Sequence, residues 1–317
     1  MGFIVEQFPI QNQSVWKFLV EELEFTLREA RRAISRKRVL LNGKPVTNPN
    51  LVGTGILKYI RFKPEKIGIT PFFETPFFAL FDKPSGIPIH PKKLVNSKSL
   101  LDEVRYLYGN YANLVHRLDR ETSGLIVASK NRCAERELKS LFQNRLVEKE
   151  YLALVRGSLK KRIKLSAPVG TQKGSLVRLK MEVVSTGREA ITEIEPILEL
   201  KINRAVEKER FTLVRLRPLT GRQHQLRVHL NYLGHPIVGD PIYGVSEEIA
   251  SHYLNGKLLI EERVRETGAS RLLLHAFKLK FTFMGRRYVF VSPTNFLKEI
   301  EKELKVEKIE TKTVPFR

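Results

Sequence analysis

Residues 114–131 read LVHRLDRETSGLIVASKN, a cluster of polar side chains followed at once by an apolar run. The run Gly124–Ala128 predicts a buried strand, because short unbroken apolar runs fit the middle of a sheet. Asp119 therefore lies at the edge of a core, with Arg117 and Arg120 beside it. A carboxylate next to guanidinium groups keeps its charge, as a nucleophile or base acting on a sugar must. A structural ion pair would explain the same spacing.

A second polar run, LTGRQHQLRVHL at residues 219–230, follows a predicted strand and leads into a helix predicted over Gln223–Tyr232. Leu226 belongs to the apolar stripe of this helix, and Arg222 lies near its N-terminus. An arginine-lined helix N-terminus suits an anion, either a phosphate or a carboxylate from elsewhere in the chain. The acidic centre of the first run and the two arginines of the second, Arg222 and Arg227, are thus complementary in charge.

Histidines recur after this point, and His224, His229 and His235 lie near Asp240 in the sequence. His224 and His229 are five residues apart, whereas two metal ligands on one helix face are spaced i, i+4. We therefore expect no metal site, and structural or RNA-facing histidines instead.

Further elements extend to both sides of these runs. We predict strands at Phe77–Phe81, Tyr151–Val155, Ala190–Glu199, Phe211–Arg217, Leu279–Phe283 and Arg287–Val291, and helices at Ser97–Tyr108, Cys133–Asn144 and Asn295–Leu304. Strands and helices do not alternate regularly, which disfavours a parallel Rossmann-type sheet. The predicted fold class is mixed α+β, with a largely antiparallel sheet and flanking helices.

Residues 14–62 form a separate small unit in this interpretation. Two short helices, at residues 15–22 and 25–34, precede a β-hairpin around the turn Asn42-Gly43. Basic side chains concentrate here, namely Arg28, Arg31, Arg32, Arg36, Lys37, Arg38 and Lys44. Such a face would follow a phosphate backbone, although a merely solvated basic face would look the same.

The overall charge supports a polyanionic partner. The 317 residues hold 56 Lys and Arg against 34 Asp and Glu, a net charge of +22, and neutralising phosphates releases counterions. A high isoelectric point that serves only solubility is the alternative. The single cysteine, Cys133, excludes an internal disulfide and cysteine-cluster metal sites, and it fits a reducing cytoplasm. No Walker loop, dinucleotide-binding glycine motif, membrane-length apolar run or secretory signal is found.

The polar runs together resemble the RluA-type pseudouridine synthases. The matching segments are DKPSG at 82–86, HRLD at 116–119 with TSG at 122–124, EKEYLA at 148–153, GRQHQLRVH at 221–229, GDPIYG at 239–244 and RLLLHA at 271–276. The related RsuA-type branch has glycine where this chain has His116. Residues 14–62 resemble the S4 RNA-binding domain, so the expected organisation is an S4-like α/β domain at 14–62, a linker at 63–75, a catalytic domain at 76–305 and a tail at 306–317.

The resemblance implies isomerisation of uridine to pseudouridine in RNA, without cofactor or metal. It assigns Asp119 as the catalytic carboxylate, which either attacks C1′ or removes the 2′ proton. It implies Tyr151 as the active-site tyrosine and Arg227 as the partner of Asp119, with Arg222 as the competing candidate.

The remaining expected contacts are to the RNA. Arg117 and His116 would fill the space left by a flipped base, Leu226 would pack against the base or within the helix core, and Lys83 and the N-terminal basic residues would bind RNA. The expected substrate is large-subunit (23S-type) ribosomal RNA, with transfer RNA, or a non-catalytic role in RNA binding or ribosome assembly, as alternatives. We expect a cytoplasmic monomer without membrane contact.

Overall fold

The computed structural model describes residues 3–91, 98–171, 180–203, 208–305 and 310–313. The chain divides into two compact units, which we describe separately: Met1–Ile67 with His90–Leu107, and Gly68–Ile89 with Tyr108–Arg317. In the described residues no helix is long and apolar enough to cross a bilayer.

The first unit contains a four-stranded sheet in the order β1-β4-β2-β3. Its elements are β1 (Phe3–Ser14), α1 (Val15–Glu21), α2 (Leu27–Ser35), β2 (Val39–Leu41), β3 (Lys44–Pro45), β4 (Val52–Phe62) and α3 (Leu100–Tyr108, of which Leu100–Leu107 lies in this unit). A capping box starts α2, since Glu29 N donates to Thr26 Oγ1 and Thr26 N donates to the Glu29 carboxylate. The predicted hairpin is confirmed: Asn42 and Gly43 have φ of 48° and 80°, as a type I′ turn requires.

Strand β1 was not predicted. It pairs with β4 from Phe3↔Phe62 to Ser14↔Val52, so the sheet starts well before residue 14. Pro9 obscured it, because proline within an apolar run argues against a central strand. The structure accommodates Pro9 because β1 is the edge strand of its sheet.

The second unit is built on an 11-stranded sheet in the order β10-β13-β14-β9-β15-β8-β6-β5, with β16 on β15, β17 on β13 and β7 on β8; β11 and β12 form a separate pair. Its strands are β5 (Phe73–Glu74), β6 (Phe78–Lys83), β7 (Asn113–Leu114), β8 (Ser123–Ser129), β9 (Glu148–Arg156), β10 (Ile163–Ser166), β11 (Val169–Thr171), β12 (Met181–Val183), β13 (Ile191–Asn203), β14 (Lys208–Pro218), β15 (Leu274–Phe283), β16 (Arg286–Val291) and β17 (Glu310–Thr313). Its helices are α4 (Arg132–Gln143), α5 (Gln225–Tyr232), α6 (Glu247–Leu254), α7 (Ile260–Thr267) and α8 (Phe296–Leu304).

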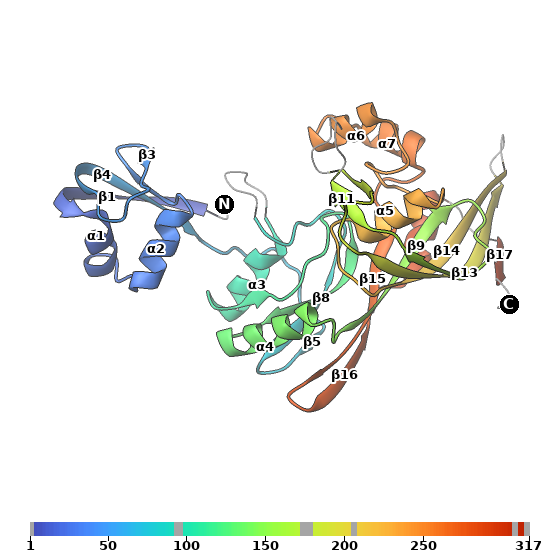
Figure 1. Ribbon diagram of the computed structural model, residues 1–317, viewed down its shortest axis with the longest axis horizontal. Coiled ribbons are helices and arrows are strands. Elements are labelled where there is room, and N and C mark those ends of the chain that lie inside the picture. Colours follow the sequence, from blue (N-terminus) through green and yellow to red (C-terminus); the bar gives the residue numbers. More distant parts are fainter. Residues whose placement is uncertain (1–2, 92–97, 172–179, 204–207, 306–309, 314–317) are drawn as a thin grey trace. The chain divides into compact units, whose positions relative to one another are not determined.

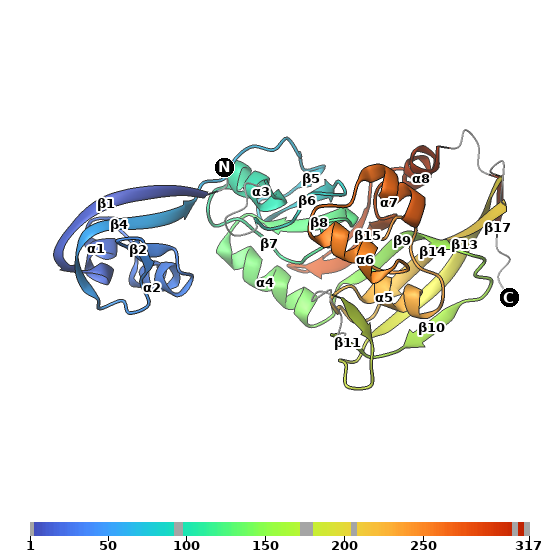
Figure 2. The same cartoon turned by 90° about the horizontal axis from the view of Figure 1, so that it is seen from above.

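This arrangement confirms the predicted fold class. All pairs of the large sheet are antiparallel except β15 with β8. One core joins α5 and α8 to β9 and β14, and a second joins α4 to β6, β8 and β15. Helices α6 and α7 lie next to each other in both views of the molecule (Figures 1 and 2). The predicted start of α3 at Ser97 lies outside the described residues, as do 306–309 and 314–317 of the tail.

The parallel pairing of β15 with β8 depends on Gly124. This residue has φ of +106° and lies opposite Ala276 in the register, and a Cβ built on it would lie 2.3 Å from the Ala276 carbonyl oxygen. The glycine therefore allows the two strands to approach closely, directly after the loop that carries Asp119.

Candidate active site

Asp119 lies in the loop between β7 and β8, with its side chain 23% exposed. The segment after β6 holds this loop in place. Gly86 N donates to the Arg120 carbonyl at 2.9 Å, and Ser85 Oγ donates to the Glu121 carbonyl at 2.6 Å. The position of the carboxylate is therefore fixed by the backbone on its C-terminal side.

Lys83 is part of this support, and the expectation that it binds RNA is wrong. Its side chain is buried, and its Nζ donates to the carbonyls of Pro84, Ile87 and Arg120 at 2.8–3.0 Å. These three bonds use every donor of the ammonium group. Burial lowers the pKa of Lys83 to about 7, against the opposing charges of Glu121 and Asp119.

Glu121 connects the same loop to α6 and α7. Arg263 Nη2 donates to its carboxylate at 2.8 Å, and Tyr253 Oη does so at 2.9 Å. Burial raises the pKa of Glu121, but Arg263, Tyr253 and Arg120 together outweigh burial, and the net shift is downward. An ionised glutamate thus joins the loop to helices more than a hundred residues away in the chain.

Arg227 lies between two carboxylates. It is buried on α5, and its Nε and Nη2 each lie 2.7 Å from an oxygen of Asp240. Its Nη1 lies 3.4 Å from Asp119 Oδ2. Burial disfavours the charged guanidinium, but Asp240 outweighs burial and the pKa of Arg227 is raised. Arg227 therefore presents a permanent positive charge to Asp119.

Arg222, the competing candidate, does not contact Asp119. Its Nε donates to the Glu189 carbonyl at 2.8 Å. Between the two arginines of the second run, the structure brings Arg227 to the carboxylate.

Two residues that sequence reasoning did not assign complete the surroundings of Asp119. His224 Nε2 lies 3.8 Å from Asp119 Oδ2, and its Nδ1 lies 2.9 Å from the hydroxyl of Tyr243. His224 has φ of 54°, so α5 begins at Gln225 rather than at the predicted Gln223. Both residues lie in segments that resemble the pseudouridine synthases, at 221–229 and 239–244. That resemblance was the one signal in the sequence that could have pointed to them.

Leu226 and Tyr151 both contact the same apolar core. Leu226 is buried within it, and Tyr151, on β9, packs against it. Burial raises the pKa of Tyr151, and the negative charge of Asp119 raises it further. The phenol is therefore neutral and within the electrostatic field of the carboxylate.

His116 and Arg117, which precede Leu118 and Asp119 in the chain, differ in exposure. Arg117 is exposed. His116 stacks on Phe142 with ring centroids 4.3 Å apart, and its Nε2 accepts a hydrogen bond from Val127 N at 3.0 Å. The ring of the half-buried His116 thus supports β8, and its contact with RNA stays a prediction.

The half-buried His116 predicts a loss of stability in acid. Burial, followed by the charge of Lys149, lowers its pKa from 6.5 to about 3. Below pH 6.5 the unfolded chain gains a proton at this site and the folded chain does not, so stability falls as the pH falls. Between pH 7 and pH 5 this one residue should cost about 2 kcal/mol. Urea unfolding of wild type and His116→Gln at both pH values checks this: the variant should lose about 2 kcal/mol less, and equal losses would contradict it.

His229 and His235, the other two histidines named above near Asp240, have partners of their own. His229 bonds to Thr192 and to the Ala167 carbonyl, and His235 bonds to the Arg156 carbonyl. Within the described part of the chain, no group of three or more His, Cys, Asp and Glu side chains is placed to hold a metal ion.

In the first unit the basic side chains differ in their surroundings. Arg38 is half-buried, with its guanidinium 5.2 Å from the centre of the Phe3 ring. Burial, followed by the charge of Arg36, lowers the pKa of Arg38. The other six basic residues named above for this unit are exposed, namely Arg28, Arg31, Arg32, Arg36, Lys37 and Lys44.

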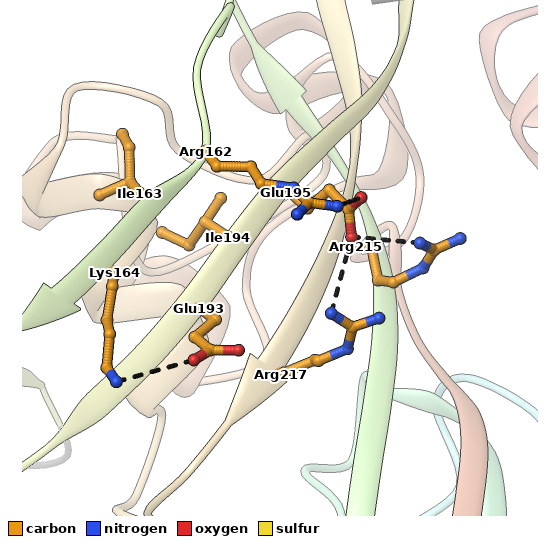
Figure 3. A pocket seen from close by; sticks show the side chains of 8 residues that line it. All are labelled: Arg162, Ile163, Lys164, Glu193, Ile194, Glu195, Arg215 and Arg217. Atoms are coloured by element: carbon orange, nitrogen blue, oxygen red, sulfur yellow. Dashed lines mark hydrogen bonds and ion pairs between the residues drawn. The ribbon is translucent and has the colours of Figure 1, made fainter. Parts of the chain in front are cut away.

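A hollow of about 350 Å³ lies on the sheet at β10, β13 and β14 (Figure 3). Its charged side chains pair with one another: Glu195 contacts Arg162 and Arg215, and Glu193 contacts Lys164. It shares no residue with the Asp119 cluster. Because none of its lining residues belongs to that cluster, the hollow is not the candidate site.

Known proteins share both units. Residues 78–232 match the family model of RNA pseudouridylate synthases, and residues 17–52 match that of the S4 domain. A protein of Helicobacter pylori strain J99, named an uncharacterized RNA pseudouridine synthase, is 37% identical over 296 residues, which cover 92% of this chain and 96% of that protein. Ribosomal large subunit pseudouridine synthase C of Haemophilus influenzae is 35% identical over 218 residues, covering 66% of this chain and 59% of that protein. The structure of human RNA pseudouridylate synthase domain containing 1 aligns with a TM-score of 0.61 at 25% identity, covering 81% of this chain and 94% of that one.

Proposed function

This chain belongs to the RNA pseudouridylate synthase family, and we propose that it isomerises specific uridines of large-subunit ribosomal RNA through Asp119. The observation that carries the role of Asp119 is its contact with Arg227, whose charge is itself fixed by Asp240. The substrate rests on relatives named ribosomal large subunit pseudouridine synthase C. The single cysteine fits a cytoplasmic enzyme, and we propose that it acts as a monomer.

The chemistry needs a charged carboxylate near the sugar. The N1–C1′ bond of the uridine breaks, the uracil rotates while still bound, C5 bonds to C1′ and the C5 proton leaves. Asp119 either attacks C1′ or removes the 2′ proton, and both routes require its ionised form. Arg227 supplies a positive charge beside it, with Nη1 3.4 Å from Asp119 Oδ2. Tyr151, half-buried and neutral, is our candidate for stacking on the uracil and for taking part in proton transfer at C5.

The target base must leave its helix before C1′ and C5 become accessible. Flipping costs a few kcal/mol, which contacts to the base and backbone must offset. The exposed Arg117, two residues before Asp119, is our candidate for filling the vacated space or holding the flipped phosphate.

Mapping pseudouridines in cells that lack this chain tests the substrate. We expect one or more sites to disappear from large-subunit ribosomal RNA and to return when the wild-type chain is supplied. Loss of pseudouridine from transfer RNA alone would mean that transfer RNA is the substrate. A growth defect rescued fully by Asp119→Asn would favour an assembly role that does not need catalysis.

RNA binding should weaken steeply with salt. Each phosphate that the protein neutralises adds roughly 0.7–0.9 to the slope of log K against log salt. Changing the exposed Arg28, Arg31 and Arg32 to Gln should flatten that slope by about 0.7–0.9 for each phosphate that is no longer neutralised. Titrating labelled ribosomal RNA at several salt concentrations measures the slope.

A charge-matched variant controls for net charge alone. Lys160, Lys161 and Lys257 are also exposed, and their change to Gln removes the same charge from the second unit. It should leave the slope within error of wild type. Equal effects of the two triple variants would contradict an RNA surface on α2.

A further inference from the structure

Two hydrogen bonds lead from strand β12 to His224, whose ring lies next to Asp119. Met181 N donates to the hydroxyl of Tyr243 at 3.0 Å, and that hydroxyl lies 2.9 Å from His224 Nδ1. His224 Nε2, on the opposite side of the ring, lies 3.8 Å from Asp119 Oδ2. His224 thus stands between a phenol and the carboxylate to which we assign the chemistry.

The donors in these two hydrogen bonds fix the tautomer of His224. The Tyr243 oxygen already accepts from the Met181 amide, so its own proton is available to His224 Nδ1. Burial raises the pKa of Tyr243, so the hydroxyl keeps that proton. Burial, followed by the charge of Arg227, lowers the pKa of His224 to about 4. A neutral ring that accepts at Nδ1 carries its hydrogen on Nε2, which faces Asp119.

The backbone around His224 is arranged to hold this orientation. His224 is a non-glycine residue with positive φ, which costs conformational energy that surrounding contacts must offset. Gln225 supplies such contacts: its Oε1 accepts from Thr220 Oγ1 at 2.8 Å and from Arg222 N at 3.0 Å.

We propose that His224 is a positioning residue, whose Nε2–H, together with Arg227, holds Oδ2 of Asp119 so that Oδ1 is the oxygen presented to the ribose. The inference rests on the proposed function of Asp119. Arg227 Nη1 and His224 Nε2 both address Oδ2. Within the described residues Oδ1 has no hydrogen-bond partner, which leaves it for the substrate.

Two substitutions at this position separate positioning from mere structure. His224→Gln keeps a donor where Nε2 stands, whereas His224→Asn keeps a polar group near Nδ1 but loses the donor to Asp119. Asparagine fits the left-handed backbone better than glutamine, so a structural role predicts that Asn is the milder change. Positioning predicts the reverse: kcat falls about 10²-fold in His224→Asn, as for a misplacement of about 1 Å, with KM for RNA unchanged. His224→Gln should stay within about tenfold of wild type. Activity of His224→Asn equal to or above that of His224→Gln would overturn the proposal.

A second measurement does not depend on catalysis. In the wild-type protein labelled with ¹⁵N at histidine, long-range proton–nitrogen correlation should show His224, assigned by its loss in His224→Asn, as the Nε2–H tautomer at pH 7. Tyr243→Phe should shift it toward a mixture of tautomers. An Nδ1–H or doubly protonated ring in wild type would overturn the proposal. If wild type formed no pseudouridine while this tautomer was observed, the proposed function would fail and the geometry of His224 would stand.

Discussion

Replacing Asp119 by asparagine is expected to slow pseudouridine formation by about 10⁴-fold or more, as for other residues on which a covalent or acid–base step depends. Asparagine has nearly the same shape and keeps a hydrogen-bond acceptor for Arg227, but it has no negative charge with which to attack C1′ or remove a proton. Release of tritium from RNA labelled at C5 of uridine, followed under single-turnover conditions, measures the chemical step.

The fold should tolerate this change. The Asp119 side chain is partly exposed, and the main partner of Arg227 is Asp240, so the free energy of unfolding should change by about 1 kcal/mol or less. Glu193→Gln removes a carboxylate at the hollow on the sheet and serves as the matched control, with wild-type rates expected. If Asp119→Asn kept a rate within tenfold of wild type, the role of Asp119 would be wrong.

Replacing Asp240 by asparagine is expected to lower the free energy of unfolding by about 3–5 kcal/mol, since it leaves the buried Arg227 without its main counter-ion. The amides of Ile242 and Tyr243 donate to Asp240 Oδ1 and could still find an acceptor in Asn, so the loss is chiefly that of the charge. Urea unfolding at pH 7 measures it. Activity should fall as well, because Arg227 loses the partner that holds it in place beside Asp119.

An ion pair with an exposed glutamate provides the comparison. Arg271 contacts Glu299, whose side chain is 40% exposed, and Glu299→Gln should cost about 1 kcal/mol or less. Comparable losses in the two variants would mean that the Arg227–Asp240 pair is not the buried anchor described above.

The central strands could be predicted from the sequence because their apolar runs are unbroken. Phe78–Lys83 and Ser123–Ser129 are buried along almost their whole length, and such runs need no knowledge of their partners. The short helices α6 and α7 were not predicted, since polar residues dominate them and their contacts with Glu121 come from a distant part of the chain.

The residue types of the site could be predicted from the sequence, but the contacts that each residue makes were harder to predict. Asp119 and Arg227 could be paired by complementary charge, but Asp240, which binds Arg227 more closely, followed only from the fold. Lys83 and His116 were assigned to RNA through the segments that carry the resemblance. Lys83 is instead buried and His116 is half-buried, each bonded to backbone groups, and this cannot be read from residue type.

Nucleoside analysis of the product tests the central claim most directly. Large-subunit ribosomal RNA prepared without the modification is incubated with the purified chain, digested to nucleosides and separated by chromatography. The account predicts that pseudouridine appears as uridine is lost, without free uracil, and that Asp119→Asn forms none. Free uracil, or no pseudouridine from any cellular RNA, would contradict it.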